Sequence, residues 1–413
     1  MDDGFRKILS GITVTPDETL EIRRLSSPFS FLSDEVNNNV NSSRPFVNDF
    51  QNSRLTHELM NGDWEIDSIS PLEPNSRPKH ILHAFDRIIL QGDGPWMLFD
   101  RECRSLGKGY LDGSDVFIDA ESRLFFFSNS SGMLEAHNLA DGNRIFSASL
   151  FFGHAYQRAF IARNGDRMVV VSIEREIDQD AEEKPENSTI EALKFNEPQK
   201  IDEDGILRSS QIVNKLIRKT LLLLSARYDE TLVVATNDQI CLLDSDLQIK
   251  TAINGEFKPF VMSLDNSGII YLVLLDNGVP KLRAIKPDGE RLFSVELPEE
   301  MLNISYPPII TYDHRVFLIK DNTMMVFAAD GSCIWEYKSR GPIAGAVVTG
   351  DDQLLISDGS ELGVFEQSGR YRTLYEFEDE TLQTPPTIME DGDLVVATNM
   401  KLYRLTIEPS KDR

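Results

Sequence analysis

Short apolar runs alternate with polar turn residues between Tyr306 and Phe377. The first three runs lie at 309–310, 316–319 and 324–327, and a fourth ends at Trp335. The dipeptide Asp330-Gly331 separates the third run from the fourth. Four short runs with turn chemistry between them predict a four-stranded antiparallel sheet in which each strand pairs with the next.

The turn before the fourth strand recurs along most of the chain. Copies of it are Asp141-Gly142, Asp244 to Asp246, Asp288-Gly289, Asp330-Gly331 and Ser368-Gly369, with a weaker one at 100–105. The later copies are spaced about 40 residues apart, which is the length of one propeller blade. Glycine adopts the positive φ that a tight turn requires, and aspartate hydrogen-bonds to its own local backbone there. The pattern therefore predicts an all-β fold, a β-propeller of four-stranded antiparallel blades.

Counting the copies gives eight blades, which lie near 80–108, 109–150, 151–215, 216–254, 255–298, 299–341, 342–378 and 379–409. Seven is the alternative, if the first unit or the irregular third unit is not a separate blade. The last unit has no fourth strand of its own. We therefore expect a strand from the N-terminal region to complete it, so that the ring closes without an open sheet edge.

Composition divides the chain into an N-terminal segment, 1–77, the propeller, 78–409, and a short tail, 410–413. In the N-terminal segment the stretch 33–54 is rich in Asn and Ser. It has too few apolar residues to offset its ordering entropy, so we expect it to be flexible. Strands are expected in the same segment at 12–14, 20–22 and 64–69.

The third unit contains an acidic segment near 177–188 that the repeat does not require. We interpret it as a long loop insertion, and such loops are often functional. Its carboxylates are therefore candidate docking residues for a basic surface of a protein partner. They are Asp178, Asp180, Glu182, Glu183 and Glu186. The alternative is a solvated, disordered insertion without a partner. Further along this unit, a partly helical spacing of apolar residues predicts a helix over 207–219.

Acidic residues outnumber basic ones by 67 to 42, which gives a formal net charge of -25. This excess argues against nucleic acid and against an anionic membrane surface as the main partner. The longest apolar stretch, around 221–224, is too short to span a bilayer, so no membrane insertion is expected. The first residues also lack the apolar run of a signal peptide. We therefore expect an acidic, soluble protein in the cytoplasm.

Chemistry-bearing residues form no recognisable constellation along the chain. Cys103, Cys241 and Cys333 are far apart, and each lies in or beside an apolar run, which favours small buried core residues. His80 and His83 have the spacing of half a metal site, but no further ligand follows at a suitable interval. We therefore predict no catalytic residue, no cofactor-binding residue and no metal ligand. Groups from different blades could still converge in the central channel.

Aromatic residues follow the turns at similar offsets, as Phe146, Phe293, Trp335 and Tyr375 do. We expect these side chains to pack between blades. Together with the Asp-Gly turn, the pattern resembles repeats of the PQQ-like, quinoprotein-type propeller superfamily over roughly residues 80–409. It departs from WD-repeat sequences, because no Gly-His and Trp-Asp pairs recur.

The resemblance implies one of two roles, a quinone-dependent dehydrogenase or a non-enzymatic assembly scaffold. For the dehydrogenase branch, the resemblance implies an exported protein with a pair of adjacent cysteines and a calcium-bound cofactor. This chain has no adjacent cysteines. The scaffold branch is therefore favoured. We predict a non-catalytic β-propeller that binds a protein partner. The alternative is an enzyme or small-ligand binder with a site in the central channel.

Overall fold

The computed structural model describes the chain from Asp63 to Glu408, with gaps in several connections. The longest gaps are 111–115, 150–154, 176–186, 195–199, 202–206 and 227–231. Several predictions fall outside the described residues. They are the strands at 12–14 and 20–22, the flexible stretch 33–54 and the acidic residues near 177–188.

The described residues form eight four-stranded antiparallel sheets, which we number in chain order, and one two-stranded sheet. Sheet 1 contains β2 (Pro78–Ala84), β3 (Arg87–Gly92), β4 (Pro95–Asp100) and β5 (Ser105–Tyr110). Sheet 2 contains β6 (Val116–Asp119), β7 (Leu124–Ser128), β8 (Met133–Asn138) and β9 (Arg144–Ser149). Sheet 3 contains β10 (Ala155–Asn164), β11 (Arg167–Arg175), β12 (Asn187–Lys194) and β15 (Ile212–Ile217). The small sheet, β13 (Lys200–Ile201) with β14 (Leu207–Arg208), lies between β12 and β15 in sequence.

The second half of the chain repeats the same plan. Sheet 4 contains β16 (Leu221–Ala226), β17 (Leu232–Thr236), β18 (Gln239–Leu243) and β19 (Ile249–Asn254). Sheet 5 contains β20 (Pro259–Leu264), β21 (Ile270–Asp276), β22 (Val279–Ile285) and β23 (Arg291–Glu296). Sheet 6 contains β24 (Ile309–Ile310), β25 (Val316–Lys320), β26 (Thr323–Phe327) and β27 (Cys333–Lys338). Sheet 7 contains β28 (Ile343–Val348), β29 (Leu354–Asp358), β30 (Glu361–Phe365) and β31 (Tyr371–Glu376).

Sheet 8 is completed by the N-terminal strand. It contains β32 (Thr387–Ile388), β33 (Leu394–Ala397), β34 (Lys401–Glu408) and, as its fourth strand, β1 (Asp63–Pro71). β1 pairs antiparallel with β34 from Asp63 opposite Glu408 to Pro71 opposite Lys401. The predicted closure by an N-terminal strand is confirmed. The predicted domain limits at residues 77 and 409 stay a prediction.

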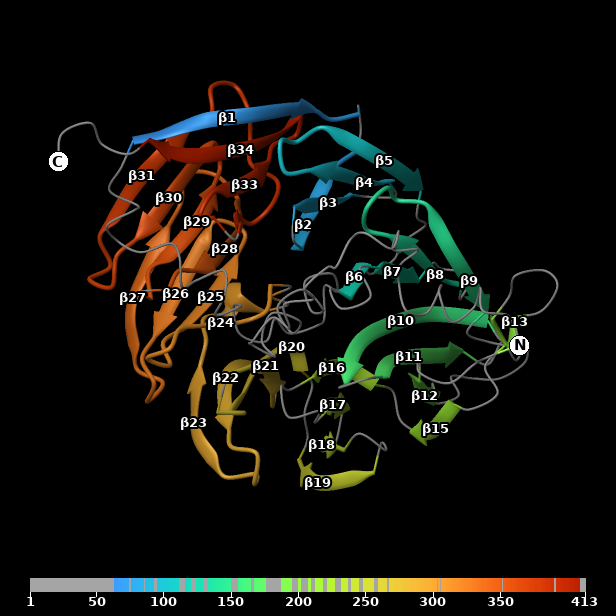
Figure 1. The fold of residues 1–413 in the computed structure, drawn as a ribbon. Helices are drawn as coiled ribbons and strands as arrows, with labels where there is room; N and C mark the ends of the chain where they lie inside the picture. Colours follow the sequence, from blue (N-terminus) through green and yellow to red (C-terminus); the bar gives the residue numbers. More distant parts are fainter. Residues whose placement is uncertain are drawn as a thin grey trace.

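The sheets lie side by side around a ring, with first strands such as β2, β24 and β28 toward the centre and fourth strands such as β5, β23 and β27 outside (Figure 1). Successive strands of a sheet are antiparallel, so the connections alternate between two faces of the ring. We call one the loop face; it holds the connections between strands 1 and 2 and between strands 3 and 4. The opposite, hairpin face holds the connections between strands 2 and 3 and those between sheets.

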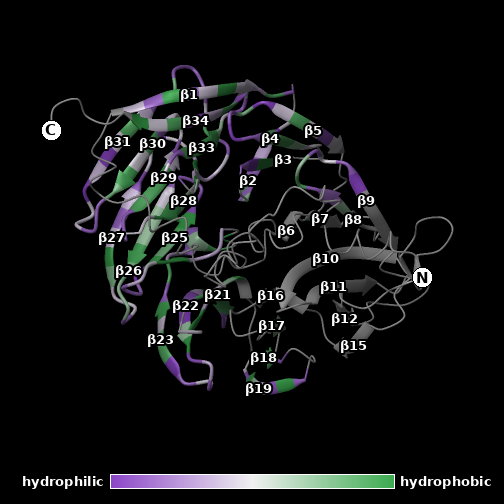
Figure 2. Cartoon of the chain, viewed as in Figure 1, coloured by the Kyte–Doolittle hydropathy of each residue, from purple (hydrophilic) through white to green (hydrophobic). Residues whose placement is uncertain are grey.

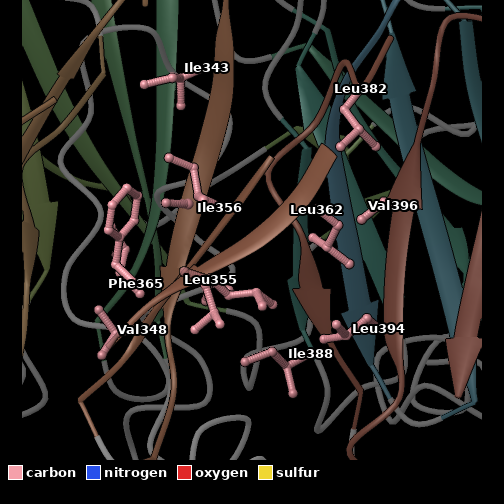
Figure 3. Packing of buried hydrophobic residues seen from close by; sticks show 14 of the residues in the cluster. Ile343, Val348, Leu355, Ile356, Leu362, Phe365, Leu382, Ile388, Leu394 and Val396 are labelled. Carbon is pink, nitrogen blue, oxygen red and sulfur yellow. The ribbon is translucent and has the colours of Figure 1, made fainter. Parts of the chain in front are cut away.

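Neighbouring sheets bury the core between them. All residues of β29 are buried, whereas β27 on the outside alternates between exposed and half-buried residues. Figure 2 shows the same division, with apolar residues concentrated on the inner strands. In Figure 3, Leu362 of sheet 7 lies beside Leu394 and Val396 of sheet 8, within one hydrophobic cluster. Strands buried on both faces read as continuous apolar runs, which is why the sequence shows runs rather than alternation.

The turns between strands 3 and 4 have the predicted chemistry. Their glycines have positive φ between 72° and 92°; they are Gly142, Gly289, Gly331 and Gly369. Oδ1 of Asp330 accepts the backbone N–H of Ser332 at 2.8 Å, and Oδ1 of Asp288 accepts that of Glu290 at 3.0 Å. The local backbone bond expected for aspartate is therefore present.

The predicted helix over 207–219 is wrong. Residues 207–208 form β14 and residues 212–217 form β15, which pairs with β12 from Leu193 opposite Ile212 to Ser188 opposite Ile217. The third sheet needs a fourth strand, and pairing with β12 overrides a weak helical spacing. No helix among the described residues is long and apolar enough to cross a bilayer.

Candidate functional site

Four connections on the loop face share one construction. In each, the first residue donates its N–H to the carbonyl of the fifth, and the fourth donates its N–H to the carbonyl of the first, at 2.8 to 3.1 Å. They join strands 1 and 2 of sheets 5 to 8, next to the ring centre. We call them together the loop arc, with residues 265–269, 311–315, 349–353 and 389–393.

The fourth position of these connections requires a positive φ. Glycine occupies it in sheets 5 and 8, where Gly268 has φ 81° and Gly392 has φ 93°. Sheets 6 and 7 have side chains there instead, His314 at φ 60° and Asp352 at φ 61°. Histidine and aspartate are among the residues that tolerate this conformation, although at some strain. Both side chains bond to the preceding sheet.

His314 reaches back to sheet 5. Its Nδ1 lies 2.9 Å from Oδ2 of Asp265, whose side chain is only 2% exposed, whereas the His314 side chain is 44% exposed. Oδ2 of Asp265 also accepts the hydroxyl of Tyr271 at 3.2 Å. Burial, followed by the nearby Asp265 carboxylate, raises the pKa of Tyr271. The buried carboxylate therefore holds one nitrogen of an exposed imidazole.

Asp352 reaches back to sheet 6 in the same way. Its Oδ1 accepts the backbone N–H of Tyr312 at 2.8 Å. Arg315 completes the junction, because it donates to the carbonyls of Asp352 at 3.0 Å and Gln367 at 3.4 Å and pairs with Asp313 at 2.8 Å. Sheets 5, 6 and 7 are thus joined at the loop face, and Tyr312, 40% exposed, stands on a fixed backbone.

A second polar cluster lies where β1 closes the ring. The buried Arg404 of β34 contacts Asp393 and Asp391 in its own sheet and Asp67 of β1, the last at 3.2 Å. It also donates to the carbonyl of Arg101 in sheet 1 at 3.3 Å. One guanidinium therefore joins the last sheet, the closing strand and the first sheet.

Carboxylates on the hairpin face fasten the connections between sheets. Asp358 accepts the hydroxyl of Tyr337 at 2.6 Å and also that of Ser339. Burial and this bond to Asp358 raise the pKa of Tyr337. Glu380 is bonded by Lys401 at 2.5 Å and by Tyr403 at 2.8 Å. These groups hold backbone connections in place.

The predicted docking residues, Asp178, Asp180, Glu182, Glu183 and Glu186, lie outside the described residues, so their role stays a prediction. The strands on either side place their segment between β11, which ends at Arg175, and β12, which begins at Asn187. The hairpin face is where the other sheets make this connection between strands 2 and 3.

The cysteine prediction is partly wrong. Cys103 and Cys241 are buried as predicted, and burial raises the pKa of Cys103 to about 11. Cys333 is exposed, because it lies on the outermost strand β27 with its side chain on the solvent side. His83 is buried in β2. Within the described part of the chain, no group of three or more His, Cys, Asp or Glu residues is arranged to hold a metal ion.

Sequence reasoning missed the loop arc. Its residues come from four sheets, and successive connections are about 40 residues apart, so no local sequence motif contains them together. One signal was present. In sheets 5, 6 and 7 a polar residue ends the first-strand run five residues before the second strand begins, as Asp265 and Thr311 do.

No protein-family model and no curated protein matches this chain. Solved structures do match it. The quinohemoprotein alcohol dehydrogenase of Comamonas testosteroni has a TM-score of 0.61 at 10% identity, over 86% of this chain and 78% of that one. The Dos1 propeller has a TM-score of 0.58 at 8% identity, over 83% of this chain and 95% of that one. Sqt1 of Saccharomyces cerevisiae has a TM-score of 0.56 at 12% identity, over 84% of this chain and all of that one. At such identities the likeness shows the fold alone, and the chain is a β-propeller.

Proposed function

We propose that this chain is a non-catalytic β-propeller that serves as a protein-interaction scaffold, in the non-enzymatic branch of the PQQ-like superfamily. Each four-stranded sheet is one blade in this proposal, so the ring has eight blades. The proposal places the protein in the cytoplasm, which its three free cysteines support.

The composition of the first strands supports a scaffold. Residues 81–84, 261–264, 309–310, 346–348 and 388–389 are buried, and most of them are aliphatic. The polar exceptions are His83 and Ser263. Ser263 donates its hydroxyl to the carbonyl of Pro308 in the next sheet at 2.6 Å. Strands of this kind make a stiff ring, and a stiff ring presents its connections in a fixed arrangement for binding.

The observation that carries the proposal is the connection between β11 and β12. In sheet 5 the two residues Asn277 and Gly278 join the corresponding strands, and in sheet 6 Asp321 and Asn322 do so. Sheet 3 has residues 176–186 in this place. Its carboxylates, Asp178, Asp180, Glu182, Glu183 and Glu186, supply the charge that a basic protein surface would recognise.

The test compares the intact protein with a variant in which these five residues become Asn or Gln. A control variant carries the same change at exposed acidic residues on other connections, Asp141, Asp288, Glu290, Asp330 and Glu378. We expect the intact and control proteins to bind one stoichiometric partner with a basic surface, and the first variant to lose it. Binding should also weaken as salt increases. Equal binding by all three proteins would exclude the acidic segment as the binding site. Failure to find any bound protein partner would contradict the scaffold function.

A second candidate function is a small-ligand or catalytic site near the ring centre. It is favoured by one observation, the exposed imidazole of His314 held by the buried Asp265.

A further inference from the structure

The two nitrogens of the His314 ring have different environments. Nδ1 lies 2.9 Å from Oδ2 of Asp265, and a carboxylate oxygen accepts hydrogen bonds, so the ring proton is on Nδ1. In the neutral ring with this tautomer, the lone pair is on Nε2. Because the two ring nitrogens point apart, Nε2 is directed away from the buried carboxylate, on a side chain that is 44% exposed.

Asp265 does not need His314 to satisfy its oxygens. Its Oδ1 accepts the hydroxyl of Ser267 at 2.7 Å and the N–H of Ile269 at 2.8 Å, and its Oδ2 accepts the hydroxyl of Tyr271. The fold does not need a histidine at this position either, because Gly392 occupies it in sheet 8. A strained, exposed and oriented imidazole is the kind of histidine that proteins use for chemistry.

The charged neighbours leave the imidazole available. Asp313, on the same connection, is paired with Arg315 at 2.8 Å. The Arg315 guanidinium is directed to sheet 7, where it bonds to the carbonyl of Asp352.

We propose that His314 is a nucleophile toward small acyl compounds, with Asp265 as its positioning residue. The Nε2 lone pair forms a bond to the acyl carbon of an ester, and the ester C–O bond breaks so that the alcohol leaves as an anion. Water then adds to the acyl-imidazole, the carboxylic acid departs, and the remaining proton passes to solvent. Asp265 stabilises the positive charge on the ring at the acylated stage. This activity does not rest on the scaffold function, so either can fail alone.

The probe is 4-nitrophenyl acetate, and the deciding variant is His314→Asn. Asparagine tolerates positive φ and can donate its amide hydrogen to Asp265, so the bond between sheets 5 and 6 is kept while the nucleophile is lost. We expect the second-order rate constant for 4-nitrophenolate release to fall at least about tenfold. When the reaction of the unsubstituted protein is quenched and the protein is digested, mass spectrometry should find a transient acetyl group on the peptide that contains His314.

Asp265→Asn tests the positioning role. In a variant with an unchanged melting temperature, we expect slower 4-nitrophenolate release at every concentration of ester. An unchanged rate of 4-nitrophenolate release in that folded variant would exclude Asp265 as the positioning residue. Because Asp265 also bonds to Ser267, Ile269 and Tyr271, its replacement can unfold the protein, so the nucleophile is judged on His314→Asn alone. An unaltered rate in His314→Asn, or acetylation elsewhere, would overturn the proposal.

Discussion

Trp335 of β27 lies against Gly369, the turn glycine of the next sheet. A Cβ added to Gly369 would be 3.0 Å from Nε1 of Trp335. Phe293 of sheet 5 has the same relationship to Gly331 of sheet 6, where an added Cβ would be 2.7 Å from Cδ2 of the ring. The expected packing of these two aromatics between sheets is confirmed. The turn glycine thus has two functions, a positive φ and room for the neighbouring ring.

Gly331→Ala should destabilise the protein by about 2 to 4 kcal/mol, because the new methyl group would both strain the backbone at φ 85° and collide with Phe293. Gly278→Ala is the matched control. Gly278 has φ 80°, but no atom lies within 4 Å of an added Cβ, so about 1 kcal/mol of backbone strain alone is expected. Urea denaturation measures both. Equal losses would mean that the ring contact contributes nothing.

Trp335→Ala should lower the free energy of unfolding by about 2 to 4 kcal/mol, somewhat below the loss for a fully buried Trp because this side chain is half-buried. Its rings contact Phe365 at a centroid distance of 5.1 Å. The neighbouring Ile334 is 47% exposed on the same strand, and Ile334→Ala should change stability by less than about 0.5 kcal/mol. Thermal unfolding that is the same for both variants would contradict the packing role.

Arg404→Met should loosen the closing strand. It removes a buried cation and leaves Asp393, whose side chain is 15% exposed, without its partner, at a cost of about 3 kcal/mol. Relative to the wild type, hydrogen exchange of the amides of residues 63–71 should then accelerate more than that of β29. The reason is that β1 also loses the ion pair of Asp67.

The control for the closing strand is Arg104→Met. Arg104 is 73% exposed, so loss of its ion pair with Asp100 should leave the free energy of unfolding nearly unchanged. If exchange in β1 is as slow in Arg404→Met as in this control, the cluster does not hold the closure.

Glu380 should make stability depend on pH. Burial raises the pKa of its carboxyl, but the bonds from Lys401, Thr398 and Tyr403 outweigh burial and lower it. The unfolded chain therefore binds this proton first, near pH 4.3, and the stabilisation is present above that pH and is lost as pH falls through the lower folded-state value.

The measurement is the difference in unfolding free energy between the wild type and Glu380→Gln. It should be about 1 to 3 kcal/mol at pH 7 and should shrink below about pH 4. Glu290→Gln is the control, since Glu290 is 60% exposed and pairs with Lys286 on the surface. A difference that does not change with pH would show that the charge of Glu380 is not what the fold uses.

Sequence patterns predicted the fold well because its signals are local. Runs such as 316–319 and the turn at Asp330 and Gly331 each specify their own conformation within a few residues. The closing strand could also be predicted, since a sheet without its fourth strand leaves an open edge. The helix over 207–219 failed for the opposite reason, because β15 is decided by its partner β12.

Sheet 1 shows what the pattern alone did not reveal. Its fourth strand has glycines where other sheets have large side chains, and Trp96 from β4 fills the space. An added Cβ on Gly109 would be 2.4 Å from Nε1 of Trp96, and the same ring reaches Gly142 of sheet 2. Sheet 1 therefore packs against sheet 2 through an aromatic ring as well, but this ring belongs to the third strand, whereas in sheets 5 and 6 it belongs to the fourth.

By itself the sequence determined the kind of fold, four-stranded sheets repeated around a closed ring, because periodicity and turn chemistry are properties of short segments. Only the tertiary structure decided which polar groups meet. His314 and Asp265 are 49 residues apart and belong to different sheets, yet their side chains bond at 2.9 Å. The ring brings equivalent connections of successive sheets side by side, so a contact between repeats depends on one position in each, and no single segment contains it.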